Sequence, residues 1–356
     1  MCRTGHRGRW NSFGPATEAD PRCRTLLSRR PTRGGGQGRR DARLRALDTA
    51  RTPFPARRHA DVELVAGQNA GWVRDLGLID TPGGLRRLGA AHPVELAGRA
   101  CPDGSVDGLR LLADLISWLF VMDDACDEDG LGASPTRLAP TVAALLEVLD
   151  RHGDPAAPAP AEAGPLGVAL DDLCRRVRDR QRPALLLRLV SQLREYLLAL
   201  LWEAAKREHR RVPGVAEYVQ MRRHTGGARP SFTLTDLAHP DLPGPDRRAD
   251  PAVAALDALA ADLVCWCNDL FSYDKERATG PDAHNLVTTI AGETGQGEEA
   301  ALRAAATRFN EGLAAYAERD AALAATGDAG VRAFLATRRN WIRATYDWSR
   351  AATRYA

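Results

Sequence analysis

Lysine is nearly absent from this chain of 356 residues. Two of its 49 basic residues are lysines, Lys206 and Lys275, which leaves 47 arginines. The bias indicates a GC-rich genome, a property of coding that carries no function, but it makes each lysine conspicuous. No run of 18 apolar residues occurs either, so the sequence predicts no helix that spans a membrane.

The seven cysteines are odd in number and scattered, which argues against a disulfide framework. We therefore expect a reducing compartment and a cytoplasmic location. Cys265 and Cys267 lie two positions apart, but no further Cys or His pair lies nearby, so we do not expect a zinc site. Buried thiols on a core helix are the interpretation that we favour.

Acidic residues are scarce near the start of the chain. Residues 1–50 hold 12 arginines and four acidic residues, a net charge of +8, so residues 51–356 carry −5 of the total of +3. Few large apolar residues occur there, and we predict a disordered Arg-rich leader. It lacks the apolar stretch of a secretory signal. Organelle targeting or nucleic-acid contact would suit it. We favour a solvated tail or a start codon assigned too far upstream, and we expect no nucleic-acid partner.

Strand-like alternation is rare, and helical periodicity continues from residue 55 onward. We expect a turn at 80–84 to end the first helix, and a break at Gly226–Gly227 with a new helix resuming near Ser231. The pattern predicts a single all-α domain over residues 51–356, with about ten or more helices around a central cavity. The predicted helices cover 60–78, 108–122, 135–149, 166–180, 183–208, 215–224, 252–276, 298–325 and 330–355, with loops at 154–167 and 238–251.

The most informative stretch lies near the end of the predicted helix 252–276. Asn268, Ser272 and Glu276 are spaced i, i+4 and i+8, which places three oxygen-bearing side chains on one helix face. Ligands that offer only oxygen suit a hard cation such as Mg²⁺. Lys275 adds a positive charge beside them. The stretch therefore predicts a face that binds metal and a diphosphate group.

An acidic cluster follows the apolar run 111–122. Asp123 and Asp127 share a helix face, since they are four residues apart. So many carboxylates are tolerable either at a solvated helix end or opposite cations, and the cluster alone leaves both interpretations open. Its members, five acids in seven residues, are Asp123, Asp124, Asp127, Glu128 and Asp129.

Taken together, the two motifs resemble those of the bacterial class I terpene synthases. The family's aspartate-rich motif, Asp-Asp-x-x-Asp or a close variant, corresponds to residues 123–128. Its second metal motif has Asn, Ser or Thr, and Glu at the spacing found here, usually with a basic residue before the Glu. The resemblance extends from about residue 51 to 355. It implies a single class I terpenoid synthase-type α-domain, three Mg²⁺ ions, a prenyl diphosphate substrate and, as is usual among relatives, a possible homodimer.

The resemblance also implies roles for individual residues. The metal ligands would be Asp123 with one of Asp127 or Glu128, together with Asn268, Ser272 and Glu276. Arg222, 46 residues before Asn268, corresponds to the family's diphosphate-sensing arginine better than its neighbour Arg223 does. Thr225 and Gly226 would be the linker residue and the helix break whose carbonyl faces the substrate. The remaining diphosphate contacts would come from Lys275, Arg354 and Tyr355.

Several of these residues also have plainer interpretations. Thr225 and Gly226 could be only a helix C-cap, and Arg354–Tyr355 only a frayed tail. Phe120 and Trp341 are either the aromatic pocket wall or ordinary core. His284–Asn285 is expected to cap a helix near the floor of the site and to have no part in catalysis.

The implied function is a Mg²⁺-dependent terpene cyclase. We expect it to ionise farnesyl diphosphate and to cyclise the carbocation to a sesquiterpene hydrocarbon or alcohol, releasing diphosphate. A monoterpene or diterpene cyclase, using geranyl or geranylgeranyl diphosphate, is the alternative. A chain-elongating prenyltransferase would carry a second aspartate-rich motif in place of Asn, Ser and Glu. A helical binding protein without catalysis would be expected to have lost motif residues, and none is lost.

Overall fold

The computed structural model describes residues 53–239, 242, 244–278, 280 and 284–352, so the predicted leader lies outside the described residues. No strand occurs in the described part, and the all-α prediction is confirmed. The α-helices are α2 (Val62–Asp75), α3 (Pro82–Ala91), α4 (Pro93–Ala100), α5 (Val106–Asp127), α6 (Pro135–Asp150), α7 (Gly164–Arg178), α8 (Pro183–Glu208), α9 (Val215–Thr225), α10 (Ala228–Leu237), α11 (Pro245–Arg248), α12 (Pro251–Arg277), α13 (Leu286–Thr294), α14 (Glu298–Thr326) and α15 (Ala329–Ala351).

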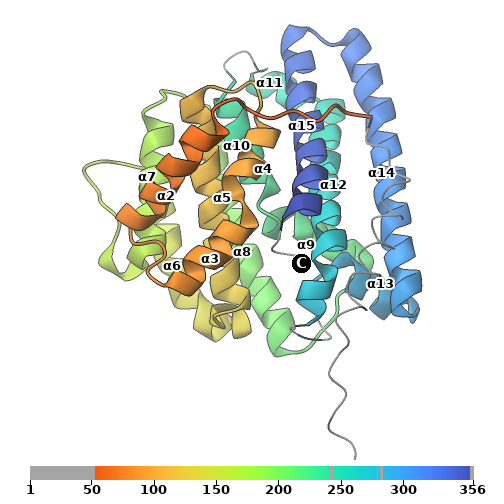
Figure 1. The fold of residues 1–356 in the computed structure, drawn as a ribbon, viewed down its shortest axis with the longest axis horizontal. Coiled ribbons are helices and arrows are strands. Elements are labelled where there is room, and N and C mark those ends of the chain that lie inside the picture. Colours follow the sequence, from red (N-terminus) through yellow and green to blue (C-terminus); the bar gives the residue numbers. More distant parts are fainter. Residues whose placement is uncertain (1–52, 240–241, 243, 279, 281–283, 353–356) are drawn as a thin grey trace, which may run out of the picture. The chain divides into compact units, whose positions relative to one another are not determined.

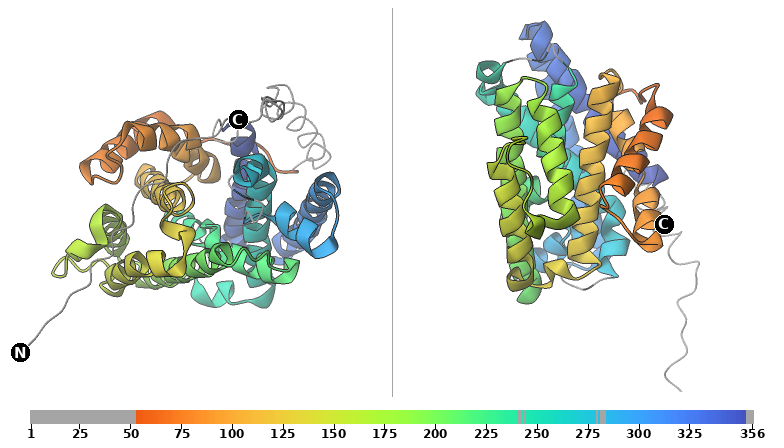
Figure 2. Two further views of the ribbon diagram at one scale, coloured as in Figure 1. Left: turned by 90° about the horizontal axis from the view of Figure 1, so that it is seen from below. Right: turned by 90° about the vertical axis from the view of Figure 1, so that its left-hand side faces the viewer.

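The helices pack side by side in one bundle. In Figure 1, α2–α7 lie on one side and α12, α14 and α15 on the other, and Figure 2 shows the same division from below. α4 joins the two sides because it packs on both α5 and α15, and α10 contacts α5, α8 and α12. Across the described residues, no helix combines the length and apolarity that crossing a bilayer requires.

Side-chain caps fix where the site helices begin. The Ser105 hydroxyl accepts from the backbone N–H of Gly108 at 3.1 Å at the start of α5. Asp250 caps α12, accepting from Ala252 N at 2.9 Å, and Pro251 occupies the first helical position. Each cap satisfies an N–H group that the helix itself leaves unpaired. The two motif helices are therefore anchored at the ends opposite their metal motifs.

Most predicted helices are observed, and the bounds of α8 match the prediction. The predicted break after the first helix is observed, but it ends at Thr81 and not at residue 84, because Thr81 caps a new helix by accepting from Gly84 N at 3.1 Å. α4 was also not predicted, whereas α13 is the helix that His284–Asn285 was expected to cap. α5 extends to Asp127, so the acidic cluster begins on its last turn. The new helix after the glycine break begins at Ala228, not near Ser231, and α11 interrupts the loop predicted at 238–251.

A buried ion-pair network joins α10, α12 and α15. Arg338 is fully buried, and its guanidinium donates to Asp236 at 2.7 Å and to Asp257 at 2.6 Å. It lies over the rings of Phe232 and Phe334, with centroid distances of 4.5 and 4.4 Å. Burial opposes the charge of Arg338, but the two carboxylates outweigh it and raise the pKa of Arg338 further. The network fixes the three helices relative to one another.

Candidate active site

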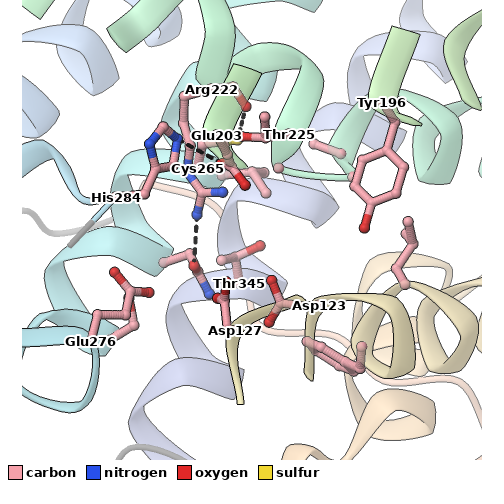
Figure 3. Close-up of a pocket in the computed structure, with 18 of the residues that line it drawn as sticks. Asp123, Asp127, Tyr196, Glu203, Arg222, Thr225, Cys265, Glu276, His284 and Thr345 are labelled. Carbon is pink, nitrogen blue, oxygen red and sulfur yellow. Dashed lines mark hydrogen bonds and ion pairs between the residues drawn. The ribbon is translucent and has the colours of Figure 1, made fainter. Parts of the chain in front are cut away.

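A cavity of about 280 Å³ lies among α4, α5, α8, α9, α10, α12 and α15. Both predicted motifs reach it. From the first come Asp123 and Asp127, and from the second come Asn268, Ser272, Lys275 and Glu276. Figure 3 shows Asp123 and Asp127 pointing into the cavity from α5, opposite Arg222.

The acidic cluster divides at the end of α5. Asp123 and Asp127 line the cavity, whereas Asp124 and Glu128 face Arg87, whose Nε lies 3.4 Å from a carboxylate oxygen of each. Glu128 also pairs with Lys275 across to α12, at 2.8 Å. Of the two candidates for the second metal ligand, the structure brings Asp127 onto the cavity lining and does not place Glu128 there.

The guanidinium of Arg207, on α8, pairs with Asp127. Nη2 of Arg207 donates to Oδ1 of Asp127 at 2.6 Å, and Nη1 donates to the Gly132 carbonyl at 2.7 Å. Partial removal from water, together with repulsion from Asp123, raises the pKa of Asp127. The carboxylate pair is thus electrostatically unfavourable without further cations.

The second motif presents its three oxygen-bearing side chains along one face of α12. Oε2 of Glu276 accepts from Nδ2 of Asn285 at 2.9 Å. Asn285 also caps α13, its Oδ1 accepting from Val287 N at 2.9 Å, as the resemblance implied. Burial and repulsion from Asp269 raise the pKa of Glu276 to about 7. A bound cation would favour the ionised form.

Arg222 points from α9 toward the second motif. Its Nη2 donates to Oδ1 of Asn268 at 3.0 Å, and its Nε donates to Asp269 at 3.0 Å. Burial opposes the charge, but Asp269 more than compensates, so the pKa of Arg222 lies well above its ordinary value. Arg223 instead forms a bidentate pair with Asp262, at 2.7 Å for both contacts. The structure places Arg222, and not Arg223, on the cavity.

The helix is interrupted between α9 and α10, at the edge of the cavity. Gly226 ends α9, and Gly227 has φ of +66°, a left-handed conformation that glycine adopts without strain. A Cβ on Gly226 would overlap Sγ of Cys265, which lies 3.6 Å from the Arg222 carbonyl oxygen. The hydroxyl of Thr225 is buried and has no hydrogen-bond partner among the described residues. The segment is both a helix C-cap and part of the cavity lining.

Aromatic side chains form the apolar lining. Phe120 stacks on Trp348, with 5.8 Å between ring centroids and 19° between planes. Trp348 is fixed by donating Nε1–H to the Ala91 carbonyl at 2.7 Å. Trp341 donates to the Thr235 hydroxyl at 2.9 Å. Phe120 and Trp341 both line the cavity while packing into the core, so the two interpretations of them are compatible.

Sequence reasoning missed a set of charged residues on α8. Glu203, Lys206 and Arg207 line the cavity together with His284. Burial opposes ionisation of Glu203, but His284, Arg207 and Arg222 lower its pKa to about 2. The scarcity of lysine was the available signal, since it singled out Lys206 as well as Lys275. Arg354 and Tyr355 lie outside the described residues, and their contact with diphosphate stays a prediction.

The side chains of both motifs fit a hard divalent cation. They offer carboxylate, amide and hydroxyl oxygens, the donors that Mg²⁺ prefers. Among the described residues, no three acidic, His or Cys side chains converge enough to hold a metal by themselves. Mg²⁺ is commonly bound by a few carboxylates together with substrate phosphates, and diphosphate oxygens would complete the coordination here.

Comparisons with known proteins agree with this geometry. A family profile described as "Terpene synthase family 2, C-terminal metal binding" matches residues 114–314. The chain is 31% identical over 312 residues to 4-epi-cubebol synthase ((2E,6E)-farnesyl diphosphate cyclizing) of Streptosporangium roseum, covering 85% of this chain and 90% of that protein. It is 34% identical over 265 residues to (+)-T-muurolol synthase ((2E,6E)-farnesyl diphosphate cyclizing) of Roseiflexus castenholzii, covering 73% and 79%.

The fold agrees as well. Wild-type cucumene synthase superposes with a TM-score of 0.72 at 25% identity, over 84% of this chain and 99% of that one. The profile match contains both metal motifs, and the alignments to these relatives cover most of each protein. The chain therefore belongs to the bacterial class I terpene synthases.

Proposed function

We propose that this protein ionises farnesyl diphosphate and cyclises the resulting carbocation to a sesquiterpene hydrocarbon or alcohol, releasing diphosphate. The observation that carries the proposal is the single cavity onto which two oxygen-rich motifs, Arg222 and an aromatic wall all converge. The preference for farnesyl diphosphate rests on the substrate named for both relatives.

The charged residues would promote departure of the diphosphate. When bound, Mg²⁺ would neutralise the negative charge that develops on the leaving group. Asp123, Asp127, Asn268, Ser272 and Glu276 would hold it. Arg222 would donate to diphosphate oxygens, and Lys275 would add a point charge once it leaves Glu128. As the C–O bond breaks, its electron pair stays with the diphosphate oxygen.

The rest of the cavity would control the carbocation. Aromatic faces stabilise a nearby cation and exclude the water that would quench it. Phe120, Trp341 and Trp348 line the cavity, and the indoles are fixed by their N–H hydrogen bonds. The carbonyl of Gly226, at the helix break, would offer a partial negative charge to the ionising end of the substrate.

Other details stay predictions: three Mg²⁺ ions, contacts from Arg354 and Tyr355, a cytoplasmic location and a homodimer. Geranyl or geranylgeranyl diphosphate remains the alternative substrate. Chain elongation is disfavoured because the second motif is not aspartate-rich.

The test is incubation of the full chain with Mg²⁺ and, separately, geranyl, farnesyl and geranylgeranyl diphosphate, with the volatile products analysed by gas chromatography–mass spectrometry. We expect a cyclic product from farnesyl diphosphate. It should disappear with a chelator and with Asp123→Asn, and persist with Asp129→Asn, a matched change at an exposed member of the same cluster. Longer linear diphosphates formed with added isopentenyl diphosphate would instead show a prenyltransferase.

A further inference from the structure

The C-terminal end of α8 lies between the two metal motifs. On one side Arg207 pairs with Asp127 of the first motif at 2.6 Å. On the other, Nζ of Lys206 lies 2.7 Å from Nδ1 of His284, whose neighbour Asn285 donates to Glu276 of the second motif. Lys206 therefore sits next to where both motifs would meet a diphosphate, and it lines the cavity.

The tautomer of His284 fixes the direction of these contacts. Its Nε2 lies 2.8 Å from Oε1 of Glu203, so we assign the ring proton to Nε2, where it faces the carboxylate. Nδ1 is then the acceptor, and Lys206 donates to it. Figure 3 shows the imidazole of His284 directed at Glu203. Burial, reinforced by Lys206 and Arg222, lowers the pKa of His284, which keeps the ring neutral.

Lys206 carries a charge for which the site supplies little compensation. The side chain is 4% exposed, and its described polar contact, with His284, uses one of its three N–H bonds. The Trp202 ring lies 4.9 Å from Nζ. Neither contact is with a carboxylate.

Burial lowers the pKa of Lys206 to about 8. The charged groups that act on it are Glu203 and Arg207 on α8, Arg211 beyond it and Glu217 on α9, with the neutral His284 in direct contact. Glu203 and Glu217 favour the ammonium, while Arg207 and Arg211 oppose it. An anion bound in the cavity would supply the missing compensation.

We propose that Lys206 is a further diphosphate-binding residue, oriented by the His284–Glu203 pair so that its remaining N–H bonds donate to the diphosphate of the substrate. The inference rests on the proposed function for the identity of the substrate. During ionisation, the electron pair of the broken C–O bond goes to the diphosphate oxygen, and the Lys206 ammonium stabilises that charge without transferring a proton.

The test measures binding of inorganic diphosphate in the presence of Mg²⁺ by isothermal titration calorimetry. Lys206→Met should weaken binding by about tenfold or more, as loss of a charge-assisted hydrogen bond implies, and Lys206→Arg should restore most of it. Arg211→Gln, five residues along the chain, should raise the pKa of Lys206 slightly. That variant removes one of the charges that oppose the Lys206 ammonium, so Arg303→Gln serves as the control for a lost positive charge: Arg303 is exposed on α14 and pairs with Glu299, and binding should not change.

Proton uptake gives a second readout that a structural role would not produce. Binding an anion raises the pKa of Lys206, so at pH 8 the wild type should take up about half a proton more than Lys206→Arg or Lys206→Met does. Titrations in buffers with different ionisation enthalpies measure this difference. If binding and proton uptake match the wild type in both variants, Lys206 only ties α8 to His284, and the inference is overturned.

Failure of this inference can be distinguished from failure of the proposed function. Turnover of farnesyl diphosphate by the wild type tests the proposed function alone. A wild type that binds diphosphate through Lys206 but forms no cyclic product would retain this inference and refute the substrate. Should Lys206→Met fail to fold, Lys206→Gln and the proton uptake of Lys206→Arg still decide the matter.

Discussion

At the scale of single residues, Asp127 and Glu276 of the two motifs have raised pKa values, which a bound metal ion would lower. Partial removal from water and repulsion from Asp123 raise the pKa of Asp127, whereas burial and repulsion from Asp269 raise that of Glu276 to about 7. Both groups therefore hold protons in the metal-free protein at a pH where they would be ionised in an unfolded chain. Metal must displace these protons.

The affinity for Mg²⁺ should therefore depend on pH. Between pH 6 and 8 we expect it to rise with pH, by up to about tenfold per unit for each displaced proton, and to level off once both carboxylates are ionised. Calorimetric titration of Mg²⁺ with inorganic diphosphate, across this range, measures the effect. An affinity that stays constant after correction for the ionisation of diphosphate itself would contradict it.

A second residue-scale prediction concerns the helix break. In Gly226→Ala the new Cβ would overlap Sγ of Cys265 and come within 3.0 Å of the Arg222 carbonyl oxygen. Overpacking of this kind costs about 1–3 kcal/mol. We expect kcat/KM to fall by about 100-fold, because the break carries Thr225 and the neighbouring Arg222.

Removing the thiol isolates the cause. In the double variant Gly226→Ala, Cys265→Ala the clash with sulfur is absent, so thermal stability and part of the activity should return. If the double variant is as impaired as Gly226→Ala, steric overlap with Cys265 is not the reason for the loss.

At the scale of helices, α5 and α12 are linked by an ion pair between Glu128, which does not line the cavity, and Lys275, which does. Both side chains are about 30% exposed, at 28% and 32%, so the pair should contribute under about 1 kcal/mol. Because Glu128 does not line the cavity, we expect Glu128→Gln to keep kcat/KM within about tenfold of the wild type.

Asp123→Asn is the comparison, since Asp123 does line the cavity. Residues that only orient a metal ligand typically cost up to about 100-fold when they are replaced. A direct ligand should cost more, so we expect Asp123→Asn to lower kcat/KM by more than about 100-fold. Equal losses in the two variants, measured at saturating Mg²⁺, would show that Glu128 reaches the metal after all.

Helix prediction succeeded where apolar periodicity was long and failed where helices were short. α8 begins at a proline and runs for 26 residues with a wide apolar face, so both ends were predictable. α3 and α4 are 10 and 8 residues long. Pro82 was assigned to a turn, although it occupies the first position of α3, as Pro93 does in α4. Only the packed structure distinguishes a proline that starts a helix from one that ends it.

At the scale of the whole molecule, the Arg338 network holds the domain together away from the motifs. Asp236 is fully buried and accepts from Arg338, with further pairs to Arg188 and Arg248. Asp236→Ala would leave Arg188 and Arg338 sharing Asp257, and it would remove the buried carboxylate that pairs with Arg248. Breaking one partner of a buried pair typically costs 3–5 kcal/mol, so we expect about that loss of unfolding free energy.

Chemical denaturation of Asp236→Ala measures the loss, with Asp246→Ala as the control because Asp246 is exposed on α11. The control should stay within about 0.5 kcal/mol of the wild type. A similarly small change in Asp236→Ala would mean that solvent enters and compensates the arginines.

In the candidate site too, residues close together in the sequence were predictable, and contacts between residues far apart in the sequence were not. Asn268, Ser272 and Glu276 were readable because one helix carries them at fixed spacing. Glu203, Lys206 and His284 were not, because the contact between Lys206 and His284 joins positions 78 residues apart. Sequence spacing also could not show that Asp127 lines the cavity while Glu128 pairs with Lys275, which depends on how the end of α5 meets α12.

The five cysteines in the described part of the chain are all buried and free. Burial raises the pKa of Cys101, Cys174 and Cys265 to about 12, so little thiolate exists at neutral pH. In the folded protein these thiols should be unreactive toward alkylating reagents and mild oxidants. The rate at which they are modified would then report how often the bundle opens, so the native cysteines can serve as probes of local and global unfolding.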